Sequence, residues 1–249
     1  MKILPVGSSS SGNCTLIYND NTRILIDCGI SAKRVFEKTG HKEFSALFIS
    51  HEHSDHIVGA GPVGRKTKVP IYIHEAVFKA KETDLNDCEI KYINETSVLQ
   101  IKSLIVKPFS TKHDAKFALG FIIEEPATNT FLCYLTDTGS ISKTMRERTK
   151  HCNAFFIECD YDDELLATYD GYDQLLKDRI SSNFGHLSTS QALEFLSEFD
   201  LTKTKGIVIG HISPRTNSPE KVKEHFMKKF ATLENKFHIA PFDAPLELT

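Results

Sequence analysis

Four side chains that can bind a metal ion lie within six residues, at His51, His53, Asp55 and His56. They follow the apolar run Ala46–Ile49, which predicts a strand, so they occupy a loop where chemistry is commonly displayed. Residues two apart in an extended backbone point to the same side, which places His51 and His53 together. Asp55 and His56 then turn toward a second point. One cation cannot easily accept all four ligands, whereas two adjacent cations can.

Each cation also needs ligands from elsewhere in the chain. His113, Asp137 and His211 each stand at or just after the end of an apolar run that predicts a strand. Any one of these residues alone would be an ordinary surface or core residue. The complete set contains imidazoles and carboxylates but no thiolate, which suits Zn, Mn or Fe. Seven histidine and aspartate residues in this order therefore predict a metal centre.

The charges at such a centre restrict its chemistry. Two divalent cations bring more positive charge than Asp55, Asp137 and a bridging hydroxide can neutralise. A water molecule bound there can ionise at about pH 7. Two metal ions about 3.5–4 Å apart suit in-line attack on phosphorus, because they contact both the entering and the leaving oxygen. Hydrolysis of an ester, thioester or lactone would use the same charges, so the ligand set alone does not determine the class of substrate.

Strands and helices alternate in a way that predicts how these residues are held. The runs that predict strands are Lys2–Val6, Cys14–Tyr18, Arg23–Asp27, Ala46–Ser50, Pro70–Ile73, Leu104–Phe109, Ala118–Glu124, Thr130–Thr136, Ala154–Glu158, Gly206–Gly210 and Lys236–Ala240. Helical spacing is found in the second half, at Tyr172–Ser182, Thr189–Phe199 and Pro219–Phe230. Dominant strands with interleaved helices predict an α/β protein whose sheets are covered by helices.

The overall composition is that of a globular protein. The 249 residues are 40% hydrophobic and 25% charged, which allows a buried core without disulfides. The six cysteines form no C-x-x-C pair, so we expect free thiols in a reducing compartment. No apolar run approaches a membrane span, and the first residues are too short for a signal peptide. We expect a single cytoplasmic domain over residues 1–249 with no membrane contact.

The spacing H-x-H-x-D-H, followed by His, Asp and His after separate strands, resembles the metallo-β-lactamase superfamily over almost the whole chain. The resemblance implies an αββα four-layer sandwich with the site at one edge, between two sheets. It also implies the ligands of each ion: His51, His53 and His113 for the first metal, Asp55, His56 and His211 for the second, and Asp137 as the bridge. Members with a flavodiiron site carry Glu in place of His53, and true β-lactamases use a cysteine ligand, so both activities are disfavoured.

Further motifs resemble a bacterial subfamily, the YycJ/WalJ-type proteins. These motifs are Gly7–Asn13, Ser110-x-x-His113-Asp114-Ala115, Asp137-Thr138-Gly139, Leu176-Lys177-x-Arg179-Ile180 and Gly185-His186-Leu187-Ser188. The subfamily resembles tRNase Z and other nucleases, so the resemblance implies exonucleolytic cleavage of DNA by a centre that holds two Zn or Mn ions. The chain departs from the pattern at Asp160-Tyr161, where relatives typically carry Asn-His, so we carry over no role to these two residues.

Two other branches of the superfamily do not fit the spacing. Only 23 residues separate His113 from Asp137, which leaves little room for the substrate-gripping arm of a tRNase Z. The 73 residues between Asp137 and His211 are too few for a β-CASP domain. A glyoxalase-type or lactonase-type acyl hydrolase, a cyclic phosphodiesterase and a non-catalytic metal-stabilised binding protein remain as alternatives. The intact ligand set argues against the last of these.

His186 is a candidate general acid, because the seven ligands already fill both metal sites without it. Glu158 ends an apolar strand, where a buried carboxylate needs a polar partner, and a Glu–His pair would keep the imidazole protonated. Phosphodiester cleavage expels a poor alkoxide leaving group, which such a donor would protonate. Alternatively, His186 only caps the entry to the helix that follows, where Ser188 and Gln191 have capping-box spacing.

Residues around the ligands have two interpretations each. Asp27 ends a predicted strand and either orients a ligand histidine or forms a turn before Gly29. The loop Gly7–Asn13 either presents backbone N–H groups to a phosphate, with Ser8, Ser9 and Asn13 as candidate substrate-binding residues, or is a plain turn.

The net charge of −3 provides no global attraction to nucleic acid, although a local patch can. Basic residues cluster modestly at Arg65, Lys66 and Lys68, at Lys143, Arg146, Arg148 and Lys150, and at Lys177 and Arg179. The first and last groups lie near segments that carry the predicted site. Phosphate contact is one interpretation of these groups, and ordinary solvated helix surface is the other.

Overall fold

The apolar runs of the sequence form two sheets that pack face to face in the computed structural model, which describes residues 1–41 and 43–249. The order of strands in the first sheet is β14 (Leu246–Glu247), β1 (Lys2–Gly7), β2 (Cys14–Tyr18), β3 (Arg23–Ile26), β4 (Ala46–Phe48), β5 (Ile71–Ile73) and β6 (Ile90–Tyr92). The order in the second is β13 (Phe237–Ile239), β12 (Ile207–Gly210), β11 (Ala154–Glu158), β10 (Thr130–Leu135), β9 (Leu119–Glu125), β8 (Leu104–Ser110) and β7 (Leu99–Ile101).

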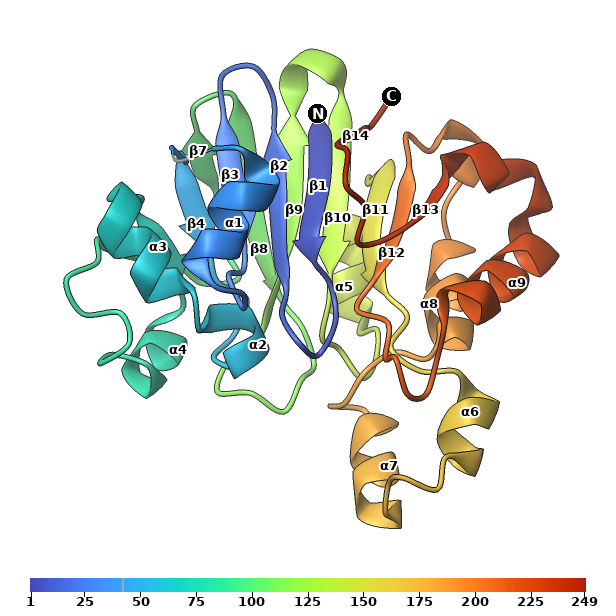
Figure 1. Ribbon diagram of the computed structural model, residues 1–249. Coiled ribbons are helices and arrows are strands. Elements are labelled where there is room, and N and C mark those ends of the chain that lie inside the picture. The colour runs from blue at the N-terminus through green and yellow to red at the C-terminus, as the bar shows by residue number, and fades with distance from the viewer. Residues whose placement is uncertain (42) are drawn as a thin grey trace.

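Each sheet is antiparallel along part of its width and parallel along the rest. Strands β3 to β6 run parallel in the first sheet, and β10 to β13 run parallel in the second. The carboxyl ends of the parallel strands meet at the lower edge in Figure 1, while both chain termini lie at the upper end. Ligands in open α/β sheets bind at such carboxyl ends, so this edge is where a site is expected.

Helices cover both outer faces. The first sheet carries α1 (Ala32–Thr39), α2 (Ser54–Ile57), α3 (Ala60–Thr67) and α4 (Glu75–Ala80), and the second carries α5 (Lys143–Thr149), α8 (Thr189–Leu196) and α9 (Pro219–Phe230) (Figure 1). Helices α6 (Asp163–Thr168) and α7 (Gln174–Ile180) project below the sheets (Figure 1). Short 3-10 turns are η1 (Pro126–Thr128), η2 (Leu201–Lys203) and η3 (Ala231–Lys236).

The buried side chains form three layers of core that explain this arrangement. One cluster fills the space between the sheets and includes Phe48, Phe121 and Phe156. A second lies under α8 and α9 and includes Phe226, and a third lies under α1 and α3 and includes Val35. A sheet that is apolar on both faces requires cover on both, which gives helix, sheet, sheet and helix in succession. The predicted αββα sandwich is confirmed.

The predicted strands are all present with ends that differ by at most two residues. The sequence prediction missed β6, β7, β14, the helices of the first half, and α5 and α6 of the second half. The predicted helix over 172–182 is shorter, because Asp173 caps α7 and Ser181 ends it. Likewise, α8 ends at Leu196 rather than at Phe199. Among the described helices, none has the length and apolarity needed to cross a membrane.

Candidate metal centre

The seven predicted ligands converge on one point at the lower edge of the sandwich. His51, His53, Asp55 and His56 follow β4 of the first sheet, and α2 begins within this run at Ser54. His113 follows β8, Asp137 follows β10 and His211 follows β12, all in the second sheet. The candidate centre is therefore assembled from both sheets, and it forms only where their edges meet.

The donor atoms form four overlapping groups, one of which joins Asp137 and His211 to Glu158 and His186, and two of the groups have no residue in common. Those of His51, His53 and His113 all lie within 4.8 Å of one another, and so do those of Asp55, His56 and His211. Nδ1 of His53 and Nε2 of His113 are 3.2 Å apart. These groups correspond to the two trios that the family resemblance implies, although this geometry alone assigns no ion to either.

Asp137 lies between the two groups. Its Oδ2 is 3.1 Å from Nε2 of His56, and its Oδ1 is 3.6 Å from Nε2 of His211 and 3.9 Å from Nε2 of His113. Burial opposes ionisation, but the imidazoles of His211 and His56 outweigh it and hold the pKa of the Asp137 carboxyl well below its usual range. A buried carboxylate in this position can contact an ion in either group.

Outer partners fix the orientation of several ligand imidazoles. Nδ1 of His56 lies 2.8 Å from Oδ2 of Asp27, and Nδ1 of His113 lies 3.0 Å from the carbonyl oxygen of Gly185. Nδ1 of His51 lies 2.9 Å from the hydroxyl of Ser50. Because each Nδ1 has an outer partner, each Nε2 is left for the centre, which is the usual arrangement around metal-binding histidines.

Asp27 is fully buried, and its two oxygens join the first sheet to the ligand loop. Oδ1 accepts a hydrogen bond from the backbone N–H of Ser50 at 2.7 Å, and Oδ2 accepts from the Ser50 hydroxyl at 2.8 Å in addition to facing His56. Of the two interpretations of Asp27, the contacts favour orientation of a ligand histidine.

Several potential donor atoms at the site make no hydrogen bond, which indicates whether the site suits a cation. Nε2 of His51, Oδ2 of Asp137 and both ring nitrogens of His211 are buried and make no hydrogen bond within the described residues. A buried polar atom without a partner costs about 1–3 kcal/mol, so a cluster of them requires a compensating ligand. Nitrogen and oxygen donors at this spacing fit divalent cations such as Zn²⁺ or Mn²⁺.

The strands that bear these residues end abruptly. Asp27, Asp137 and His211 have positive φ angles of 58°, 56° and 48°, a left-handed conformation that is uncommon for residues other than glycine. Asp27 and His211 directly follow β3 and β12, and Asp137 lies two residues after the end of β10. Backbone strain of this kind occurs at functional sites, and here it coincides with three residues of the candidate centre.

Residues of the first loop hold the ligand run in place from behind. Gly29 approaches it so closely that a Cβ atom there would lie 1.6 Å from the carbonyl oxygen of Asp55. The backbone N–H of Asn13 donates to this same oxygen at 2.7 Å. The Asn13 side chain is buried and lies 2.9 Å from Nε2 of His56, so it contacts the ligands themselves.

The serines of the first loop have different surroundings. Ser8 is buried, and its hydroxyl accepts a hydrogen bond from the backbone N–H of His211 at 2.8 Å. Ser9 lines a separate hollow beside Arg34, whereas Ser10 lines the pocket above the candidate centre. Of this loop, Ser10 is thus the residue placed toward a substrate, and the sequence prediction did not single it out.

His186 and Glu158 form a pair beside the candidate centre. Nδ1 of His186 lies 3.0 Å from Oε2 of Glu158, which is fully buried. Burial opposes protonation of the imidazole, but the hydrogen bond and charge of Glu158 outweigh it and raise the pKa of His186 to about 9. His186 also lines the pocket and stacks on His211 with 5.2 Å between ring centroids.

The two residues that depart from the subfamily pattern differ in position. Asp160 is largely buried, lines the pocket and lies 3.8 Å from Nδ1 of His211. Burial raises the pKa of its carboxyl. Tyr161 is buried away from the pocket, and its backbone bridges to Ser188.

Most of the clustered basic side chains already have protein partners. Arg65 donates to backbone carbonyls of Asp84 and Asn86. Arg146 pairs with Glu198, and Arg179 pairs with Asp114 beside the pocket at 2.5 Å. Only Arg179 of these lines the pocket, so the structure favours ordinary surface for the first two groups.

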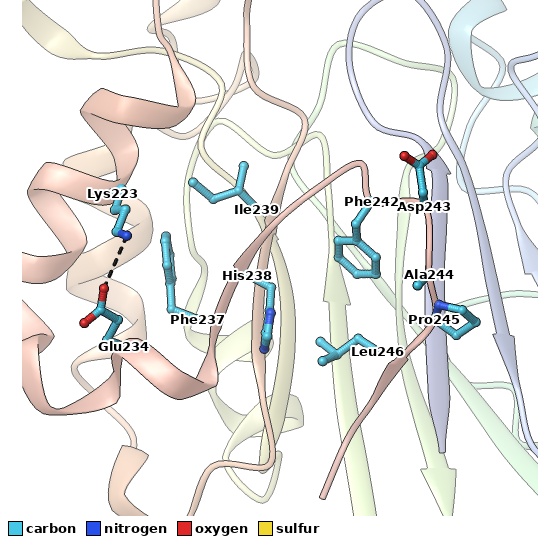
Figure 2. Close-up of a pocket in the computed structure, with 10 residues that line it drawn as sticks. All are labelled: Lys223, Glu234, Phe237, His238, Ile239, Phe242, Asp243, Ala244, Pro245 and Leu246. Carbon is cyan, nitrogen blue, oxygen red and sulfur yellow. Dashed lines mark ion pairs between the residues drawn. The ribbon is translucent and has the colours of Figure 1, made fainter.

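The pocket over the candidate centre has a volume of about 220 Å³. A second hollow of about 660 Å³ lies between α9, η3 and the C-terminal segment, as Figure 2 shows. That hollow contains the Lys223–Glu234 ion pair and one imidazole, His238, among mainly apolar side chains (Figure 2). Among the described residues, those around this hollow form no cluster of metal donors, so the candidate chemistry lies at the smaller pocket.

Comparisons with known proteins agree with this geometry. The family model described as "Beta-lactamase superfamily domain" matches residues 22–212. The chain is 30% identical to Exodeoxyribonuclease YycJ of Bacillus anthracis, over 86% of this chain and 83% of that protein. It is 31% identical to Exodeoxyribonuclease WalJ of Streptococcus pneumoniae, over 86% and 82%. The metallo-β-lactamase fold protein YhfI from Bacillus subtilis superposes with a TM-score of 0.76 at 17% identity, over 99% of both chains.

The fold, the donor cluster and these matches define a metal-dependent hydrolase. The chain belongs to the metallo-β-lactamase superfamily.

Proposed function

We propose that the chain hydrolyses phosphodiester bonds with a dinuclear metal centre and that its substrate is DNA, degraded from an end. The observation that carries this proposal is the pair of buried Glu158 and half-buried His186 beside the seven metal donors. An acyl hydrolase needs no such pair, whereas a phosphodiesterase must expel a poor alkoxide. The names of the two curated relatives support the same substrate class.

In this proposal His51, His53 and His113 would hold one ion and Asp55, His56 and His211 would hold the other, with Asp137 placed between the two groups. When bound, the two cations supply Lewis-acid charge and a nucleophile derived from water near neutral pH. Asp27 fixes the ring of His56, and Asn13 fixes the Asp55–His56 backbone, so the donors stay preorganised.

His186 supplies the proton that the leaving oxygen requires. Its Nδ1 is held by Glu158, so its Nε2–H is available to the pocket. Hydrolysis forms a bond from a water oxygen to phosphorus, and this water gives up one proton to solvent. The bond from phosphorus to the leaving oxygen breaks, and the leaving oxygen takes the proton of His186, which solvent then restores. A positioned donor of this kind contributes about 10²–10⁴-fold to the rate.

One assay tests this function against the alternatives. Protein loaded with Zn²⁺ or Mn²⁺ is incubated separately with end-labelled linear DNA in single- and double-stranded form, closed circular DNA, a cyclic phosphodiester and an S-acyl glutathione. We expect mononucleotide release from linear DNA and no cleavage of closed circles. Hydrolysis of the S-acyl glutathione alone would overturn the proposal, and nicking of the circles would reject attack from an end. Metal analysis of the same protein should give two equivalents per chain.

A further inference from the structure

Part of the pocket lining is apolar. Besides the imidazoles and carboxylates of the candidate centre, the pocket has an apolar wall of Tyr172, Leu176 and Ile180, which lie on or just before α7. Water, a free phosphate or an inorganic anion would gain nothing from such a wall. A ligand with an anionic part and a flat apolar part would be complementary to both sides.

Packing of the fold does not explain these apolar side chains. Helix α7 contains no buried residue, and Leu175 on it is 81% exposed. The helix is held by polar contacts instead, since Arg179 pairs with Asp114 and Lys177 donates to the carbonyl oxygen of Ala167 at 2.7 Å. In Figure 1 the segment stands away from the body of the sandwich. Its apolar wall is therefore available to a ligand.

Tyr172 has the surroundings of a stacking residue. It is partly exposed, and the guanidinium of Arg215 lies 5.9 Å from its ring centroid. Tyr169 packs against it at 4.8 Å with an interplanar angle of 76°. Arg215 is exposed and forms no ion pair with any residue that the structure describes, so its charge is available beside the pocket. An aromatic ring with an adjacent arginine is a common platform for nucleobases.

We propose that Tyr172 stacks on the base of a nucleotide adjoining the scissile phosphate and that Arg215 borders the same subsite. This inference rests on the proposed phosphodiesterase function and specifies how its substrate is held. The pocket volume of about 220 Å³ is below the about 300–1,000 Å³ of sites that enclose a whole small molecule. A pocket of this size encloses only part of a substrate, so the remainder of the strand lies outside it.

The test combines a protein change with a substrate change. Cleavage of linear DNA is compared with cleavage of the same DNA carrying a tetrahydrofuran abasic nucleotide on one side, then on the other side, of the first scissile bond. For the wild-type protein we expect one abasic substrate to lower kcat/KM by about 5- to 150-fold, the effect of losing one base–aromatic stack. Tyr172→Ala should show a similar loss on normal DNA and no further loss on that abasic substrate.

Two variants isolate the role of the ring. Tyr172→Phe keeps the ring and should discriminate between the substrates like the wild type, whereas Tyr172→Leu should discriminate like Tyr172→Ala. Tyr92→Ala is the matched control, because Tyr92 is an exposed tyrosine on β6 that does not line the pocket. The ratio between two substrates is measured on one preparation, so a partly unfolded variant does not alter it.

The outcomes separate this inference from the function on which it rests. If the wild-type protein cleaves DNA but Tyr172→Ala discriminates against the abasic end as strongly as the wild type does, the stacking role is rejected and the nuclease function stands. If the wild-type protein releases no nucleotide from any DNA, the proposed function fails together with the subsite.

Discussion

The two carboxylate oxygens of Glu158 have different partners: one faces the imidazole of His186, and the other accepts a hydrogen bond from the backbone of Thr138. Oε2 lies 3.0 Å from Nδ1 of His186, and Oε1 accepts a hydrogen bond from the backbone N–H of Thr138 at 2.7 Å. Thr138 directly follows Asp137, so His186 and Asp137 are both tied to the turn after β10. A shift of either group would move the other.

Substitution of His186 tests its role as the proton donor. His186→Ala should lower kcat on DNA by about 10²–10⁴-fold, because the alkoxide then departs without a proton. A diester with a nitrophenolate leaving group needs no such proton, so its hydrolysis should fall far less. Equal losses on both substrates, or loss of a metal equivalent in the same preparation, would rule the role out.

Asp55 should be required for turnover but not for folding. Its side chain is partly exposed, and the carbonyl oxygen that Asn13 holds belongs to the backbone, which Asp55→Ala preserves. We expect metal content to fall from two equivalents to one and kcat to fall at least about 10²-fold, as when a preorganised electrostatic group is lost. The Tm of the metal-free protein should change by less than about 4 °C. An insoluble or molten variant would instead make Asp55 structural.

Asp27→Asn should weaken metal binding, because Asp27 faces Nδ1 of His56 and also accepts from the Ser50 hydroxyl, which lies beside Nδ1 of His51. Asparagine tolerates the left-handed backbone of this position, so the turn is retained, but its amide cannot replace a carboxylate facing Nδ1. Affinity for one of the two ions should fall by about 10- to 100-fold, measured by competition with a fluorescent chelator. Asp20→Asn, at an exposed position after β2, is the control and should leave both affinities unchanged. Unchanged affinity in Asp27→Asn would show that His56 needs no such partner.

The buried ion pair between the Met1 ammonium and Glu125 should make stability depend on pH. Burial opposes ionisation of Glu125, but the ammonium at 2.7 Å and the hydrogen bonds from Thr128 and Asn19 hold its pKa below the usual range. A lowered folded-state pKa contributes stability that is complete above the unfolded value and is lost as pH falls through the folded value. Glu125→Gln should lower the free energy of unfolding by about 1.5–3 kcal/mol at pH 7.

That difference should shrink below about pH 4.5, where the unfolded glutamate becomes protonated. Urea titrations of the chelated protein at pH 7 and pH 4 measure it. Glu37→Gln is the control, since its pair with Lys33 is exposed and should contribute less than about 1 kcal/mol at either pH. A deficit of the same size at both pH values would contradict the assignment.

The sequence predicted the strands and the positions of the candidate ligands because both depend on local signals. Long apolar runs form the sheets, and polar residues directly after them must lie at a sheet edge. Helix α3 gave no such signal, since its sequence AGPVGRKT contains two glycines with low helix propensity. Both are required by packing: a Cβ on Gly61 would lie 2.1 Å from the carbonyl oxygen of Asp84, and one on Gly64 would lie 2.9 Å from the sulfur of Cys88.

Contacts between distant segments were beyond prediction from the sequence. The placement of Ser10 in the pocket and of Ser8 under His211 depends on how the first loop meets β12, about two hundred residues later. The positive φ angles of Asp137 and His211 are likewise set by the turns of the folded chain. Helix α1 could have been predicted from the sequence, because Ser31 and Gly40 are typical residues for the start and the end of a helix.

The seven candidate ligands are divided between the two sheets, and this division has a consequence for how the chain can be cut. Strands β1 to β6 and the run His51–His56 precede the mainly exposed stretch 94–98, and the second sheet with His113, Asp137 and His211 follows it. Two fragments divided there would each hold an incomplete set of donors. The free energy of binding a cation would then add to that of the apolar contact between the sheets, so divalent cation would strengthen the association of the fragments.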